Sequence, residues 1–157
     1  MTPSIVPRLL RTLDLRGGDP PHVSAASGLV VVKGHLYVVA DDELALGVFA
    51  HPGEAPGTLL PLAAGELPHD HEARKAVKPD CEALALVPAS ALLPHGALLA
   101  LGSGSRPTRE RGFVVPLDAA GAVAQPPRAI DLTPLYSTLR ARLGELNIEG
   151  AFSPQVA

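Results

Sequence analysis

Short runs of β-branched and aliphatic residues recur along this chain, separated by turns rich in glycine, proline and acidic residues. The first group comprises Leu29–Val32, His35–Ala40, Leu44–Phe49 and Leu59–Leu62. Lys33 and Gly34 separate the first two runs, and a glycine that can take a positive φ is typical of a two-residue hairpin turn. The pattern predicts three sequential antiparallel strands, with the fourth run as the outer strand of the same sheet.

A second group repeats this order with longer loops. Its runs are Leu84–Val87, Ala97–Leu101, Gly112–Leu117 and Arg128–Leu132. We therefore expect two antiparallel meanders, over 29–49 and 84–117, packed face to face. Ahead of both groups, Ile5–Leu15 has the composition of one further strand, which the glycines and prolines after it bring to an end.

Two stretches favour helix instead. Thr133 can cap a helix N-terminus, Pro134 suits the first helical position and Gly144 suits the stop, so we expect a short helix near 134–143. Residues 71–77 can form one or two helical turns. These turns must end before Pro79, because the residue before a proline avoids the α region.

Three tripeptides open corresponding segments: Ser27-Gly28-Leu29, Glu82-Ala83-Leu84 and Glu149-Gly150-Ala151. Recurrence in fixed order indicates a repeat architecture, although small-residue tripeptides also recur by coincidence in a chain rich in alanine and glycine. The fold class we predict is mainly β, an incomplete β-propeller of antiparallel four-stranded blades. The expected organisation is an entry segment 1–26, blade one 27–63, a connection 64–80, blade two 81–132, a helix and connection 133–146, and the start of a truncated blade three 147–157.

Six residues follow the third tripeptide. We therefore expect a gene fragment, a frameshifted or misannotated product, or an element completed by another chain. Open blades would leave apolar faces and strand edges uncovered, and the chain alone should be marginally stable or self-associating. The side chains expected to include such uncovered faces are Val30, Val32, Leu36, Val38, Leu98, Leu99 and Leu101.

The composition of the chain argues against several classes of protein, among them nucleic-acid-binding, secreted and membrane proteins. A net charge of −3 and five aromatic residues, two Tyr and three Phe, argue against a nucleic-acid-binding surface. The single cysteine, Cys81, excludes an internal disulfide and a cysteine-based zinc site. The first 15 residues lack the apolar core of a signal peptide, and no apolar run reaches the roughly 18 residues of a membrane span. We expect a soluble, cytoplasmic protein that binds neither nucleic acid nor membrane.

Carboxylates form the first candidate site. If the repeats are equivalent, Ser27, Glu82 and Glu149 occupy corresponding points beside a central channel, where Asp41, Asp42 and Asp80 add further acids. Clustered carboxylates without thiols suit a hard cation such as calcium, and calcium is the candidate cofactor, although no calcium-loop motif is present. The alternative is that these acids cap turns and bind strand-end amides.

The loop Gly102–Gly112 is the best anion-binding candidate. Its glycines allow backbone amides to approach a ligand, and guanidinium groups match phosphate or carboxylate. The candidate residues are Ser103, Ser105, Arg106, Arg109 and Arg111. Alternatively, the arginines fix the loop by pairing with nearby acids, and we expect Arg106 or Arg109 to contact Glu82 or Glu149.

Other chemistry is weakly supported. His69 and His71 would share one face of a strand, but a third metal ligand is not evident and a solvated loop is the better interpretation. Acidic neighbours raise the pKa of a thiol, so Cys81 is expected to be a buried, unreactive side chain. The sequence Gly102-Ser103-Gly104-Ser105 lacks the spacing of a hydrolase nucleophile elbow.

Several motifs resemble those of bacterial phytase-like propeller proteins, and within that group a bacterial family with no assigned function. They cover almost the whole chain: Ser27-Gly28-Leu29, Gly34–Asp42, Arg74–Leu84, Leu101–Pro107, Arg109–Gly112 and Leu146–Ala151. The resemblance implies a propeller fold, and fold alone does not imply function. Complete propellers close their ring, whereas this chain ends inside the third copy.

We therefore expect an uncharacterised phytase-like propeller protein that acts as a ligand-binding or scaffold module. Its polar site would lie at the channel mouth and take an unknown small anionic ligand. The alternative is a metal-assisted hydrolase of phosphorylated or ester substrates, in which Arg106, Arg109 or Arg111 holds the substrate.

Overall fold

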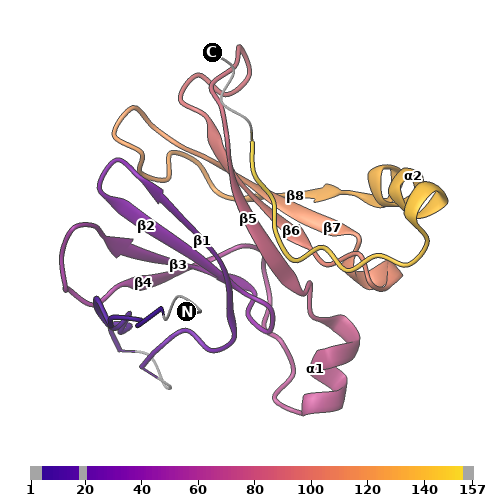
Figure 1. The fold of residues 1–157 in the computed structure, drawn as a ribbon, viewed down its shortest axis with the longest axis horizontal. Helices are drawn as coiled ribbons and strands as arrows, with labels where there is room; N and C mark the ends of the chain where they lie inside the picture. Colours follow the sequence, from indigo (N-terminus) through magenta and orange to yellow (C-terminus); the bar gives the residue numbers. More distant parts are fainter. Residues whose placement is uncertain (1–4, 18–20, 154–157) are drawn as a thin grey trace.

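The chain is mainly β and folds into two four-stranded antiparallel sheets joined by a short helix (Figure 1). The computed structural model describes residues 5–17 and 21–153. The first sheet has the order β1-β2-β3-β4. Its strands are β1 (Ala26–Val32), β2 (His35–Ala40), β3 (Ala45–Ala50) and β4 (Thr58–Pro61). The β1–β2 hairpin turns at Lys33 and Gly34, whose φ angles are 41° and 90°, as expected for a turn that needs two positive φ values.

The second sheet repeats this topology with the order β5-β6-β7-β8. Its strands are β5 (Cys81–Val87), β6 (Ala97–Gly102), β7 (Arg111–Pro116) and β8 (Arg128–Asp131). Helix α1 (His71–Val77) lies between the sheets in sequence, a single 3-10 turn (Pro107–Arg109) precedes β7, and α2 (Thr133–Leu143) follows β8. The predicted strands of both groups are confirmed. Within residues 5–17 and 21–153 the two sheets do not close into a ring.

The two sheets pack against each other through one shared core, which confirms the face-to-face prediction. Tyr37 and Val39 of β2 join Leu98 of β6 and Val115 of β7 in this core. Strands β1 and β5 cross closely, because a Cβ added at Gly28 would lie only 2.8 Å from the backbone nitrogen of Leu84. The small residue of the first tripeptide therefore permits the approach of the second sheet.

The outer faces of both sheets are covered in part by other segments of the chain. Leu36 and Val38 pack with Leu15 of the entry segment, and Leu101 packs with Tyr136 of α2 and with Leu146. Our expectation of uncovered blade faces is therefore wrong for most of the listed side chains. The buried ones are Val32, Leu36, Val38, Leu98 and Leu101, whereas Val30 and Leu99 are half-buried.

Two local predictions need correction. The stretch Ile5–Leu15 forms no strand. Its backbone makes isolated bridges from Asp14 to His22 and from Leu15 to Gly57, and these do not extend into a strand ladder. Helix α2 has Leu132 rather than Thr133 at its N-cap, and the Thr133 amide donates to the Asp131 carboxylate at 2.9 Å. Gly144 ends the helix as predicted.

Helix α1 confirms the two-turn interpretation of residues 71–77. Asp70 caps it, accepting a 2.9 Å hydrogen bond from the Ala73 amide. Neither helix of the described chain is long and apolar enough to cross a membrane.

Candidate functional site

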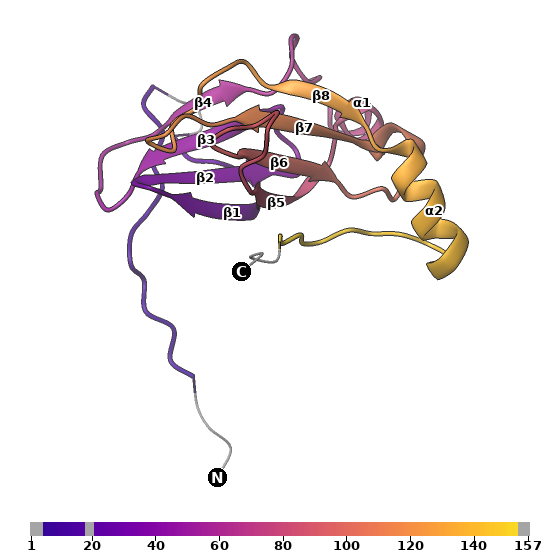
Figure 2. The same cartoon turned by 90° about the horizontal axis from the view of Figure 1, so that it is seen from above.

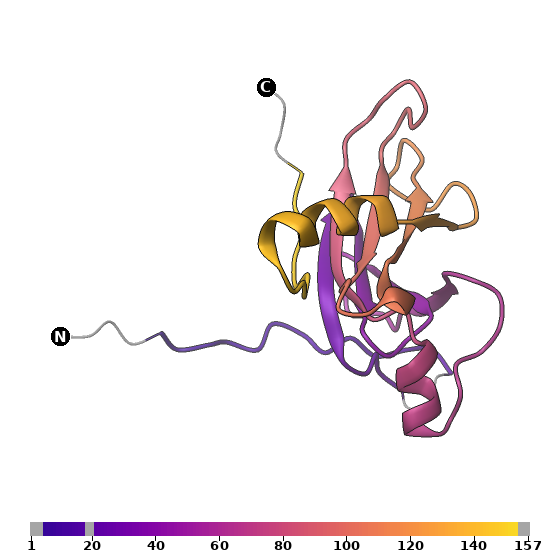
Figure 3. The same cartoon turned by 90° about the vertical axis from the view of Figure 1, so that its right-hand side faces the viewer.

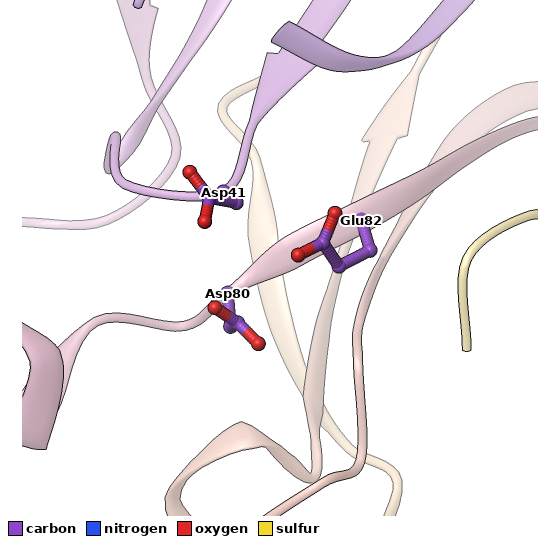
Figure 4. Close-up of side chains that lie close together, drawn as sticks. All are labelled: Asp41, Asp80 and Glu82. Carbon is purple, nitrogen blue, oxygen red and sulfur yellow. The ribbon is translucent and has the colours of Figure 1, made fainter. Parts of the chain in front are cut away.

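Three carboxylates from the two sheets meet where β2 ends and β5 begins. Asp41 follows β2, Asp80 immediately precedes β5, and Glu82 lies on β5 (Figure 4). One oxygen from each side chain lies within 4.8 Å of the others. The crossing of β1 and β5 thus places residues far apart in sequence at one edge of the molecule.

Asp80 is the buried centre of this group. Its side chain is 6% exposed and forms salt bridges with Lys78 Nζ at 3.0 Å and with Arg109 Nη1 at 2.8 Å. The Ser103 hydroxyl donates to the same carboxylate at 2.6 Å. Lys78 Nζ also contacts Asp41 Oδ2 at 2.6 Å, so one ammonium group bridges two carboxylates.

Backbone contacts fix the position of Asp80 between its two cationic partners. Its φ is 56°, a left-handed conformation that Asp tolerates better than most residues. The Ser103 amide donates to the Asp80 carbonyl at 2.9 Å, which ties the start of β5 to the end of β6. A Cβ at Gly102 would lie 2.4 Å from the Arg109 carbonyl oxygen, so the loop passes too closely here for any larger residue.

The loop serines complete the support of Arg109. Its guanidinium donates to Ser105 Oγ at 2.9 Å, and the two hydroxyls of Ser103 and Ser105 lie 2.8 Å apart. Because the Ser103 proton points to Asp80, Ser105 donates to Ser103. The loop therefore forms a chain of polar contacts that ends on Asp80.

Electrostatics distinguish Lys78 from Glu82. Burial opposes charge on Lys78, but hydrogen bonds to Asp41 and Asp80 outweigh it and raise the Lys78 pKa above its usual value of 10.5. Burial also raises the pKa of Glu82, helped by the negative charges of Asp80, Asp41 and Glu149 and opposed by a hydrogen bond from Ser27. Within the described chain Glu82 has no ion-pair partner, unlike Asp41 and Asp80.

A cavity of about 430 Å³ opens over these groups. Its lining combines both signs of charge: Asp41, Asp42, His71, Arg74, Lys75, Lys78, Asp80, Glu82, Arg109 and Asn147. Such a lining can bind a small polar molecule through donors and acceptors together, which a purely acidic or purely basic patch cannot do.

The residues present do not fit calcium as they are arranged. Calcium takes six to eight oxygen ligands, but the position between Asp41 and Asp80 is taken by Lys78 Nζ. A cation could enter only by displacing this ammonium group. Asp41 and Asp80 act here as partners of the protein cations Lys78 and Arg109.

Comparison with known proteins places the chain in a family. Residues 22–155 match the model of a family of unknown function, DUF6929. The chain belongs to this family. No curated protein matches the chain, and no solved structure matches it. The DUF6929 family has no assigned activity, so the phytase-like resemblance remains a prediction.

The predicted anion loop of this DUF6929 protein divides into two parts. Ser103, Ser105 and Arg109 support Asp80, whereas Arg111 is directed to the Thr108 carbonyl at 3.1 Å. Arg106 is exposed and, among the residues that the structure describes, forms no ion pair. The loop therefore does not bring its three arginines together around one anion.

We expected Arg106 or Arg109 to contact Glu82 or Glu149, and this prediction is wrong about the acidic partner. Arg109 pairs with Asp80, which is buried one residue before β5 and therefore meets the loop directly. Glu149 is exposed and accepts a hydrogen bond from Asn147. Asp42 accepts one from the Ser24 hydroxyl at 3.0 Å.

Sequence reasoning missed Lys78, the cation that joins the two carboxylates, and Arg74 and Lys75 of α1, which line the cavity. One available signal was the order Lys78-Pro79-Asp80, which places a cation and an anion on either side of a rigid residue. A further ion pair, between half-exposed Arg140 and buried Glu110 at 2.6 Å, joins α2 to the same loop and had no local signal.

Proposed function

We propose that this chain is a ligand-binding module of a phytase-like β-propeller, with its two sheets as neighbouring blades. Strands β1 and β5 are the first strands of their sheets and lie side by side, as inner strands of adjacent blades do (Figure 1). The 430 Å³ cavity at the start of β5 would be the polar site at the channel mouth. Further blade-forming segments would complete the ring.

One observation carries the assignment of a ligand. Glu82 and Lys75 both line the cavity, and within the described chain neither forms an ion pair. Arg74 and Asp42 line it without an ion pair too, but they are engaged by other protein groups. Arg74 donates to the Pro68 and Asp42 carbonyls, and Asp42 accepts from the Ser24 hydroxyl. The other central charges, Asp80 and Arg109, already neutralise each other at 2.8 Å. A ligand that fits the two remaining groups is a small anion, for Lys75, that also carries an ammonium or hydroxyl donor for Glu82.

Thermal unfolding with added small molecules tests this proposal. The probes are phosphoserine, which carries a phosphate and an ammonium group, and inorganic phosphate, which has no ammonium group to meet the Glu82 carboxylate. A ligand that binds only the folded state raises its stability by mass action. We expect phosphoserine to raise the melting temperature more than phosphate does, and Glu82→Gln and Lys75→Met each to reduce the shift.

Glu72→Gln is the matched control, because Glu72 is exposed beside the cavity and does not line it. It should leave the phosphoserine shift unchanged. Equal shifts with both probes, or a shift that the Glu82 and Lys75 variants do not alter, would contradict the proposal.

A metal-assisted hydrolase is the second candidate, because three carboxylate oxygens lie within 4.8 Å. It ranks second because Lys78 occupies the space between two of the carboxylates. Calorimetric titration with calcium, followed by turnover assays on p-nitrophenyl phosphate and p-nitrophenyl acetate, distinguishes the two. Calcium binding together with turnover supports the hydrolase, and inertness in both assays supports the binding module.

A further inference from the structure

The N-terminal stretch Ile5–Leu10 is an apolar arm that covers nothing in its own chain. Its aliphatic side chains are almost fully exposed: Ile5 90%, Val6 84%, Leu9 80% and Leu10 76%. Figures 2 and 3 both show this indigo segment running away from the two sheets. Pro7 favours an extended conformation at the residue before it, so the arm has the form of a ready-made extended peptide.

The base of the arm is fixed on the first sheet. The Arg11 guanidinium donates to the Ala50 carbonyl at 2.9 Å and to the Ala55 carbonyl at 3.5 Å. Both acceptors belong to the end of β3 and the loop after it, two strands away from β1. The arm therefore leaves the body on the side of β3.

An apolar groove of about 450 Å³ lies elsewhere on the same chain, between β1 and β5. Leu29 of β1 and Leu86 of β5 line it and are 54% and 39% exposed. Phe152, 87% exposed, borders it from the segment after α2. Val31, two residues after Leu29 on the same strand, is also exposed at 46%. The groove follows the edge of β1 that has no strand partner in its sheet.

The groove and the arm are complementary in charge and in length. One end of the groove is acidic, because Glu82 and Glu149 stand two residues before the groove residues Leu84 and Ala151. The arm is basic, because it carries Arg8 between its two pairs of aliphatic residues. Six extended residues span roughly 20 Å, close to the length of a seven-residue strand such as β1. Exposed apolar patches of this kind mark interaction sites.

We propose that the arm Ile5–Leu10 of one copy docks in the β1–β5 groove of a second copy, and that the exchange is reciprocal. A two-fold dimer presents the same pair of surfaces twice. Each arm would bury its aliphatic side chains against Leu29, Val31 and Leu86, and Arg8 would approach the acidic end of the groove. Of the residues named for the dimer, only Glu82 also lines the polar cavity.

Mixed disulfide formation tests the geometry. Cys81 is buried, so a variant with Leu9→Cys and a separate variant with Val31→Cys each carry one reactive thiol. Mixed at micromolar concentration under mild oxidation, they should form a cross-linked heterodimer. The control partner is Ala129→Cys, an exposed position on β8, which should not cross-link with Leu9→Cys.

Light scattering after size-exclusion chromatography tests the energetics on the full chain. The unmodified protein should be a dimer whose fraction rises with concentration, and Leu9→Glu combined with Leu10→Glu should shift it to monomer by at least tenfold in dissociation constant. These exposed positions leave the fold intact, which circular dichroism verifies. A monomer at all concentrations overturns the proposal. So does a disulfide between two Val31→Cys chains that forms in preference to the mixed one, because it would mean edge-to-edge pairing of β1.

Discussion

Replacement of Asp80 by asparagine separates the charge of this residue from its shape and backbone. Asparagine tolerates the left-handed conformation that Asp80 adopts at φ 56°. The substitution removes the negative charge that both Lys78 and Arg109 contact, and these side chains are only 13% and 11% exposed. Breaking a buried ion pair by removing one partner costs about 3–5 kcal/mol, because the other charge remains buried.

The lower end of this range applies here. Lys78 retains Asp41 at 2.6 Å, and Arg109 retains the Ser105 hydroxyl at 2.9 Å. We therefore expect Asp80→Asn to lower the free energy of unfolding by about 3 kcal/mol. With a urea slope of about 2 kcal/mol/M, the midpoint of unfolding should fall by roughly 1.5 M.

Urea unfolding followed by far-ultraviolet circular dichroism measures the change, with Glu72→Gln as control. Glu72 pairs only with His71, and both side chains are about four-fifths exposed, so this variant should stay close to the wild-type midpoint. If Asp80→Asn moves the midpoint no further than Glu72→Gln does, the contacts of Asp80 do not stabilise the fold. The carboxylate would then be free to serve a ligand.

Three further changes probe other parts of the molecule. Gly28→Ala forces a Cβ against the second sheet and should cost about 1–3 kcal/mol in thermal unfolding, whereas Gly150→Ala, built into open space among the described atoms, should cost far less. Because the folded pKa of Lys78 is raised, its stabilisation is present below pH 10.5 and is lost as pH rises through the folded value. The stability gap between wild type and Lys78→Met should therefore close at alkaline pH, and a constant gap would argue against the shift. Burial raises the pKa of Cys81 to about 12, so an aromatic disulfide reagent at pH 8 should label it only after unfolding.

The strands were predictable because their signals are local. Alternating aliphatic runs and turn glycines lie within a few residues of one another, and His35–Ala40 was predicted with its observed bounds. The strand prediction for Ile5–Leu15 was wrong because the composition of this stretch suits a strand, whereas strand pairing depends on a partner that is not adjacent in sequence. Composition alone cannot distinguish an apolar arm from an edge strand.

The candidate site was predictable only in its residue types. Asp41, Asp80 and Glu82 were expected to gather, and they do. That they gather around Lys78 follows from the close crossing of β1 and β5, which no local pattern encodes. The buried ion pairs turn an expected cation site into a neutralised network, in which Glu82 is the acid without an ion pair among the described residues.

The recurring tripeptides have a physical meaning, which explains why the strands were predictable and the ligand of the site was not. The middle residue of each is small, and in the first two tripeptides it lies where the next segment packs. Gly28 meets Leu84 of the second tripeptide, and buried Ala83 shares a core with Ala151 of the third. Each copy thus leaves room for its successor, as required for repeats that stack in sequence. Among the described atoms, a Cβ at Gly150 meets nothing within 4 Å. A motif that encodes the spacing between neighbouring segments predicts architecture well, and it carries no information about which molecule the cavity beside it binds.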